Sequence, residues 1–220
     1  MTLQIINRVA DGPIAYREAW EWQRELVAQR AAGDVPDTLL LLTHPPTVTY
    51  GKTADPKHRL LSPEEYARRG IKLVETDRGG DVTYHGPGQL VGYPILHLGE
   101  NRRDLHRYVR GLEGVVLTAL SRLDAAGADR APFHAGIWAG DGYVAALGVR
   151  VSRWVTHHGF ALNVTPEVLP GFATIVPCGV PGKYIETASG LAGRDVTVAQ
   201  AGQAVAASFE NWWQEWLARS

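Results

Sequence analysis

Residues 77–90 read Asp77-Arg78-Gly79-Gly80-Asp81-Val82-Thr83-Tyr84-His85-Gly86-Pro87-Gly88-Gln89-Leu90 and carry the densest chemical signal in the sequence. The glycines let this backbone pass close to a ligand, and five side chains supply polar groups: Arg78, Thr83, Tyr84, His85 and Gln89. On glycine content alone, the stretch fits a plain hairpin turn better than a binding loop. It matches neither the dinucleotide-binding fingerprint nor the phosphate-loop pattern, so it gives no support for nucleotide binding.

Strand signals surround this stretch. Residues 71–76, 82–85 and 90–98 are rich in β-formers and separated by glycine-bearing turns, so we expect them in the middle of one sheet. Pro94 indicates a sheet edge or a bulge within the last of these strands. Further strands are predicted at residues 38–43, at residues 136–151 as a hairpin around Asp141-Gly142, and at residues 158–164.

Helix signals open with a proline or a capping side chain and mostly end at a glycine. They predict helices at residues 13–33, 62–70, 104–127 and 197–220. The aromatic stripe of the last helix is typical of core packing. Together the elements predict one α+β domain over residues 1–220, with a mixed, mostly antiparallel β-sheet flanked by helices.

The composition is that of an ordinary globular protein, with 45% hydrophobic and 20% charged residues. A net charge of −1 gives no general reason to bind nucleic acid. We find neither an export signal nor a bilayer-spanning apolar run, and therefore expect a cytoplasmic protein with no membrane partner. A basic patch for an acidic partner is predicted at Arg102, Arg103, Arg107 and Arg110.

Cys178 is the only cysteine, so an intrachain disulfide and a multi-cysteine zinc site are both excluded. It lies between a proline and a glycine in Val176-Pro177-Cys178-Gly179, which indicates a loop. A nucleophilic thiol needs a partly exposed position, whereas inert cysteines usually lie in apolar strands or helices. From these residues alone, an inert and a reactive thiol fit equally well.

Histidines mark two further segments. His157 and His158 lie in a predicted strand, where neighbouring side chains point to opposite faces. We therefore expect at most one of them to reach any pocket, and no two-histidine metal site. His44, which ends the strand at residues 38–43, is expected to anchor a loop.

Taken together and in this order, the segments resemble the lipoyl(octanoyl) transferase family of lipoic acid biosynthesis. The resemblance runs from about His44 to the Pro177-Cys178-Gly179 loop, and the string Arg78-Gly79-Gly80-Asp81-Val82-Thr83-Tyr84-His85-Gly86-Pro87-Gly88-Gln89-Leu90 is its most specific part. It implies a fold shared with biotin protein ligases and lipoate protein ligases.

The resemblance also implies an acyltransferase activity with an acyl-thioester on Cys178. The octanoyl donor would be octanoyl-acyl carrier protein, and the acceptor a lysine ε-amine on a lipoyl domain of a 2-oxoacid dehydrogenase or on the glycine cleavage H protein. No cofactor or metal is expected. By the same resemblance, a narrow slot for the acyl chain is expected from Arg78, Gly79, Gly80, Asp81, Val82, Thr83, Tyr84, His85, Ala146, Leu147, Gly148, Gly159, Phe160 and Ala161.

The chain departs from the family at Tyr143. In the family a lysine stands directly before the segment that here begins at Val144, and it is credited with lowering the pKa of the cysteine. A neutral phenol supplies no positive charge to stabilise a thiolate. His85, His158 and Lys183 are therefore the candidates for the base that activates Cys178.

Two other functions stay open. An ATP-dependent lipoate or octanoate ligase would share the fold, although the sequence lacks a recognisable nucleotide loop. A catalytically impaired acyl-binding homologue is the second alternative, because Tyr143 replaces the family lysine.

Overall fold

The computed structural model describes residues 2–100, 103–131, 135–177 and 183–218. Their larger sheet has the strand order β1-β2-β6-β10-β9-β8-β7, and β11 pairs with β9. A smaller sheet has the order β4-β3-β5. The bounds in the larger sheet are β1 Leu3–Asn7, β2 Asp37–Leu42, β6 Gln89–Ile95, β7 Asp129–Arg130, β8 Gly136–Ala139, β9 Gly142–Ser152, β10 Val155–Asn163 and β11 Tyr184–Ile185. Those in the smaller sheet are β3 Thr47–Tyr50, β4 Lys72–Glu75 and β5 Val82–His85.

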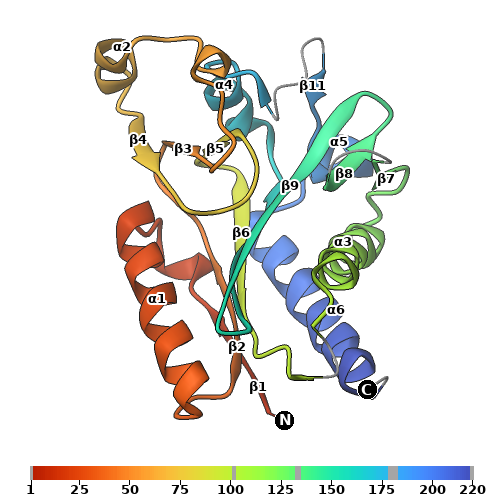
Figure 1. Cartoon of the computed structure of the whole chain (residues 1–220). Coiled ribbons are helices and arrows are strands. Elements are labelled where there is room, and N and C mark those ends of the chain that lie inside the picture. The colour runs from red at the N-terminus through yellow and green to blue at the C-terminus, as the bar shows by residue number, and fades with distance from the viewer. Residues whose placement is uncertain (1, 101–102, 132–134, 178–182, 219–220) are drawn as a thin grey trace.

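Helices cover both faces of the larger sheet. Figure 1 shows α1 on one side of the strands and α3 and α6 on the other, while α2 and α4 lie near the smaller sheet. The helices are α1 Tyr16–Ala32, α2 Pro63–Arg68, α3 Leu105–Arg122, α4 Leu169–Phe172, α5 Ala188–Ala192 and α6 Val198–Ala218. None of the helices in the described ranges is both long and apolar enough to cross a bilayer. The α+β class and the mostly antiparallel pairing predicted from sequence are confirmed.

Strand β2 shows why the sheet is covered on both faces. All six of its residues are buried, and successive side chains point to opposite faces. Leu39 and Leu41 pack in the cluster that includes α3 and α6, whereas Leu40 and Leu42 pack in the cluster that includes α1. A strand buried on both faces needs a continuous apolar run, and leucine occupies every position from 39 to 42.

The helix boundaries follow local capping. Gly33 ends α1 in the left-handed conformation with a φ of 88°, the side chain of Ser62 caps α2, and that of Asp104 caps α3. The expectation that α3 continues to Gly127 is wrong, because it ends at Arg122 and Asp124 adopts a φ of 59°.

The central strands do not form one sheet as expected. Strands β4 and β5 pair with β3 in the smaller sheet, and only β6 enters the larger one. Pro94 is also not at a sheet edge, since β6 lies between β2 and β10. The ladder between β6 and β10 is instead interrupted near Pro94, where the N–H of His158 donates to Gln23 Oε1. A proline is tolerated there because it has no N–H to pair.

Candidate functional site

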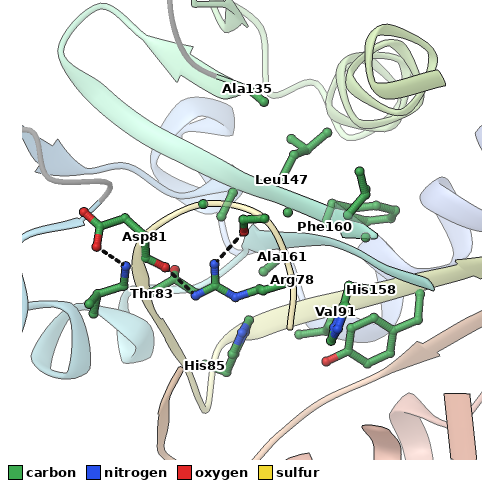
Figure 2. A pocket seen from close by; sticks show the side chains of 18 of the residues that line it. Arg78, Asp81, Thr83, His85, Val91, Ala135, Leu147, His158, Phe160 and Ala161 are labelled. Atoms are coloured by element: carbon green, nitrogen blue, oxygen red, sulfur yellow. Dashed lines mark hydrogen bonds between the residues drawn. The ribbon is translucent and has the colours of Figure 1, made fainter. Parts of the chain in front are cut away.

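A cavity of about 470 Å³ lies where the loop before β5 meets β9 and β10. Its size falls in the range of small-molecule sites. The residues predicted for the acyl slot converge on it from segments that are far apart in sequence: Arg78, Gly79, Gly80, Asp81, Val82, Thr83, His85, Ala146, Leu147, Gly148, Gly159, Phe160 and Ala161 all line it. Figure 2 shows the wall of β9 and β10 facing the loop around Arg78.

Tyr84 is the one residue of that predicted set outside the cavity lining. Its ring packs against Phe172 of α4, with ring centroids 5.6 Å apart, in the core of the smaller sheet. A Cβ added to Gly171 would lie 2.0 Å from the Tyr84 ring, so that glycine makes room for it. Tyr84 therefore supports the loop from behind.

Glycines permit the close approach of the loop to its neighbours. A Cβ on Gly148 would lie 2.9 Å from the carbonyl oxygen of Gly79, and one on Gly51 would lie 2.0 Å from that of Gly80. The loop is tied down on both sides, because the N–H of Gly79 donates to Val149 O at 3.2 Å and that of Thr53 donates to Gly80 O at 3.3 Å. The glycine-rich stretch is therefore a wall of the cavity and not a plain hairpin turn.

Arg78 organises this loop from inside. Its guanidinium donates to both oxygens of Thr49, to Gly79 O at 3.0 Å and to Asp81 O at 2.7 Å, so the loop curls around the charge (Figure 2). The Asp81 carboxylate accepts from the N–H of Val82 at 2.7 Å and lies 2.5 Å from His58 Nδ1. Arg78 thus brings a buried positive charge to the cavity wall.

His157 and His158 both approach Asp77, and the expectation that they point to opposite faces is wrong. His158 Nε2 lies 2.7 Å from Asp77 Oδ1, and His157 Nε2 lies 4.0 Å from Asp77 Oδ2. The two ring centroids are 5.1 Å apart. The physical reason is the φ of 54° at His158, which breaks the extended backbone on which the alternation depends.

Asp77, His157 and His158 offer ligand atoms within 4.8 Å of one another, close enough to hold a metal ion. The carboxylate is already engaged, however, because Arg150 Nη1 lies 2.5 Å from Oδ2 and His158 donates to Oδ1. That histidine bond, more than the nearby positive charges, lowers the pKa of Asp77 to about 2. A cation would have to displace a guanidinium, so the geometry fits a hydrogen-bonded cluster better than a metal centre.

The two cavity histidines differ in their surroundings. Among the residues that the structure describes, His85 forms no ion pair. Its Nδ1 lies 2.8 Å from Gln89 Oε1, and burial together with His44 and Arg78 lowers its pKa well below the usual value. Burial also lowers the pKa of His158, although the bond to Asp77 opposes this shift. Both imidazoles are therefore neutral at physiological pH.

A tyrosine–histidine network that the sequence did not reveal lies next to His85. Tyr16 stacks on His85, with ring centroids 5.4 Å apart, and its hydroxyl is bonded to that of Tyr93. Tyr93 Oη lies 2.7 Å from His44 Nε2, while His44 Nδ1 lies 2.7 Å from Ile14 O. His44 thus anchors the loop before α1, and Tyr16 and Tyr93 line the cavity. Their spacing in the sequence is ordinary and gives no signal of this.

Tyr143, which the resemblance places where the family has a lysine, lines the cavity. Its ring packs on Trp138, with centroids 4.5 Å apart, and its carbonyl accepts from the N–H of Glu186 and from Asn163 Nδ2. Lys183 does not line the cavity, because its ammonium pairs with Asp141 at the surface. Cys178 lies outside the described residues.

The described arginines of the predicted basic patch each contact a different residue. Arg103 lies over the ring of Trp154 and Arg107 over that of Trp216, each 4.7 Å from the ring centroid. Arg110 pairs with Glu113 at 2.9 Å, and Arg102 lies outside the described residues. The described arginines are exposed, Arg103 just before α3 and the other two within it, and Val109 of the same helix lines the cavity.

Known proteins match this chain over most of its length. A family model described as the lipoyl protein ligase A/B catalytic domain matches residues 15–210. An octanoyltransferase from Gloeobacter violaceus is 50% identical over 205 residues, which cover 91% of this chain and 87% of that protein. An octanoyltransferase from Chloroflexus aurantiacus is 50% identical over 177 residues, covering 79% of this chain and 78% of that protein.

The fold is also found among solved structures. A putative lipoate protein ligase from T. acidophilum with bound lipoic acid superposes with a TM-score of 0.71 at 15% identity, over 96% of this chain and 85% of that chain. At this identity the likeness concerns the fold alone, and it confirms the lipoate ligase-like fold expected from the resemblance.

Proposed function

Because the chain belongs to the lipoyl protein ligase A/B catalytic domain family, we propose that it is an octanoyltransferase, an acyltransferase acting in protein lipoylation. Identity of about half to octanoyltransferases over most of both chains is the observation that carries the proposal. The donor would be octanoyl-acyl carrier protein in the cytoplasm. The acceptors would be lysines on the lipoyl domains of 2-oxoacid dehydrogenases and on the glycine cleavage H protein.

The cavity supports this proposal by its shape and chemistry. Leu147, Phe160 and Ala161 give the cavity an apolar wall, and the glycines at positions 148 and 159 add no side chain to it. A linear acyl chain fits such a slot, while Arg78 and two neutral histidines concentrate polar groups at one side. The reacting thioester would lie where these polar groups meet the apolar wall.

The proposed reaction proceeds in two steps with Cys178 as nucleophile. The Cys178 thiolate attacks the donor carbonyl, a new C–S bond forms, and the carrier thiolate leaves. The lysine amine then attacks the thioester, the C–N bond forms, and the C–S bond breaks as the amine proton passes to the thiolate. The N–H of Gly79 donates to Val149 O, so it is committed to the loop and is a poor donor for the oxyanion that forms when either nucleophile attacks the carbonyl.

The approach of the chain to residue 178 is consistent with this role. The N–H of Val176 donates to His58 O at 2.8 Å, and His58 is bonded to Asp81, which lines the cavity. Lys183 follows residue 178 along the chain, and its ammonium is paired with Asp141. Among the three candidate bases, His85 and His158 line the cavity and Lys183 does not.

The proposal is tested by incubating the protein with octanoyl-acyl carrier protein and a lipoyl domain in the absence of ATP, followed by intact mass measurement of both proteins. We expect octanoylation of the lipoyl domain and a hydroxylamine-labile octanoyl adduct on the enzyme. Since Cys178 is the only cysteine, such an adduct reports that residue, and Cys178→Ala should abolish it. Transfer only from free octanoate with ATP would indicate a ligase instead. No octanoyl group on either protein would favour an acyl-binding homologue.

A further inference from the structure

His85 has a neighbour that determines which of its ring nitrogens carries the proton. His85 is in strand β5, and Gln89, four residues later, begins β6. Gln89 Oε1 lies 2.8 Å from His85 Nδ1, and both side chains are buried. The tautomer of His85 therefore depends on whether the group that faces Nδ1 is an oxygen or a nitrogen.

Two backbone carbonyls fix that orientation. Gln89 Nε2 lies 3.1 Å from Tyr84 O, which can only accept, so this end of the carboxamide must be the NH₂ group. Asn163 is oriented in the same way, because its Nδ2 lies 3.0 Å from Tyr143 O. Asn163 Oδ1 then accepts from Gln89 Nε2 at 2.9 Å. The hydrogen bonds that link Tyr143 O, Asn163 and Gln89 pair a donor with an acceptor only when both carboxamides have this orientation.

The consequence falls on His85. Gln89 Oε1 has no hydrogen to donate, so His85 Nδ1 must carry the proton and donate it to Gln89. In the neutral ring Nε2 then holds a lone pair. Figure 2 shows the ring of His85 pointing towards Arg78 and the cavity. Its position there makes Nε2 a proton acceptor at the site of the proposed reaction.

His158 is arranged differently. Its Nε2–H donates to Asp77, and its Nδ1 is a buried atom with no hydrogen-bond partner among the described residues. An incoming amine therefore has no access to the lone pair of His158. Of the two cavity histidines, His85 is the one placed to exchange a proton with a bound substrate.

We propose that Gln89 and Asn163 are positioning residues that hold His85 in the Nδ1–H tautomer, so that Nε2 takes the proton from the attacking lysine amine. The inference rests on the proposed octanoyl transfer. The proton moves from the amine nitrogen to His85 Nε2 as the C–N bond forms, and from Nε2 to the departing thiolate as the C–S bond breaks. Neither glutamine nor asparagine touches the substrate.

The electrostatic surroundings of His85 keep Nε2 unprotonated before the reaction. Arg78 from the preceding loop is a cation whose charge acts on His85, while His44 after β2, Tyr16 of α1 and His158 of β10 are the titratable neighbours of His85. Gln89 is neutral, so it fixes the tautomer without the stabilisation of imidazolium that a carboxylate would give.

The tautomer can be read directly in the wild-type protein by long-range ¹⁵N–¹H correlation spectra of ¹⁵N-histidine-labelled enzyme. The His85 signals are assigned by their loss in His85→Gln. We expect the Nδ1–H pattern, and an Nε2–H pattern would overturn the proposal. This readout needs no activity, so it stands even where the octanoyl-transfer assay fails and the proposed function falls.

Variants of Gln89 test the network. Gln89→Met removes the acceptor, so both tautomers of His85 should form and the lysine-transfer step should slow about tenfold or more, while octanoylation of Cys178 persists. Gln23→Met is a matched control, since Gln23 is also fully buried but bonds to the N–H of His158. It should leave the His85 spectrum unchanged. A wild-type tautomer and a wild-type transfer rate in Gln89→Met would contradict the proposal.

Gln89→Glu retains an acceptor for His85 but replaces Gln89 Nε2, which donates to Tyr84 O and Asn163 Oδ1, by a second oxygen. Two acceptors facing that oxygen favour the protonated carboxyl, whose proton takes the place of the Nε2 hydrogens. The Nδ1–H tautomer should therefore be preserved, and the pH profile for lysine transfer should stay close to that of wild type. An Nε2–H tautomer in this variant, with lysine transfer at the wild-type rate, would contradict the positioning role of Gln89.

Discussion

His44 should make the protein sensitive to mild acid. Its ring is 1% exposed, and burial lowers its pKa from 6.5 to about 4. In the unfolded chain the imidazole gains a proton as the pH falls through about 6.5, whereas the folded protein does not bind that proton until about pH 4. The unfolded state therefore binds more protons in this window, and the free energy of unfolding must fall as the pH is lowered.

The magnitude follows from the size of the shift. A shift of one pKa unit corresponds to about 1.4 kcal/mol, so His44 alone removes about 3 kcal/mol between pH 7 and pH 4. This is a large fraction of the ~5–15 kcal/mol that stabilises a typical domain. Burial lowers the pKa of His157 to about 4 as well. Its protonation in the unfolded chain therefore also lowers the free energy of unfolding as the pH falls.

The assay is urea unfolding at a series of pH values from 7.5 to 4.5. In wild type, the free energy of unfolding should fall as the pH is lowered, and His44 contributes to the slope of this fall. His44→Gln should reduce the slope by up to about 1.4 kcal/mol per pH unit because glutamine does not titrate. Tyr93→Phe is the matched control, since it removes the hydrogen bond to His44 Nε2 but leaves the imidazole buried. Equal slopes in wild type and His44→Gln would refute the assignment.

Three further changes probe the cavity, the cysteine and the core. Gly148→Ala places a methyl group 2.9 Å from Gly79 O, so we expect a loss of about 1–3 kcal/mol in urea unfolding and weaker acyl transfer, whereas an unchanged KM for octanoyl-acyl carrier protein would contradict a role in the slot. Tyr143→Lys should move iodoacetamide alkylation of Cys178 to lower pH by placing an ammonium at the position of the family lysine, with Tyr143→Met as the neutral control. Leu40→Ala should cost about 2–5 kcal/mol in the core beneath α1, and a cost below about 1 kcal/mol would show that the site collapses to fill the space.

Much of the fold could be predicted because its signals are local. Capping residues such as Ser62 and Asp104 placed helix starts correctly, and the continuous leucines of β2 predicted a buried strand. The beginning of β10 was missed for a physical reason. Arg153 and Trp154 both have positive φ, in a turn that is usually made by Asn-Gly. These two residue types therefore do not indicate that a strand begins at Val155.

The site was less predictable because it depends on long-range pairing. The residues predicted for the acyl slot came from a family resemblance, and the cavity that most of them line is assembled from loop 78–81, β9 and β10. Pro94 is a local signal of an irregular ladder, but nothing local indicates that His158 opposite it takes a positive φ. That distortion brings both histidines to Asp77, and strand periodicity predicted the opposite.

The chain uses two kinds of partner to set its two cavity histidines. Asp77 accepts the Nε2 proton of His158 and adds a negative charge, which opposes the fall in the pKa of His158 that burial causes. Gln89 accepts the Nδ1 proton of His85 and adds no charge, so burial and the charge of Arg78 act on His85 without opposition from a carboxylate. A base must be unprotonated when the amine arrives, and a neutral carboxamide orients the ring while preserving that state. A partner that carried a negative charge, as Asp77 does for His158, would instead raise the pKa of His85 and move the reaction to higher pH.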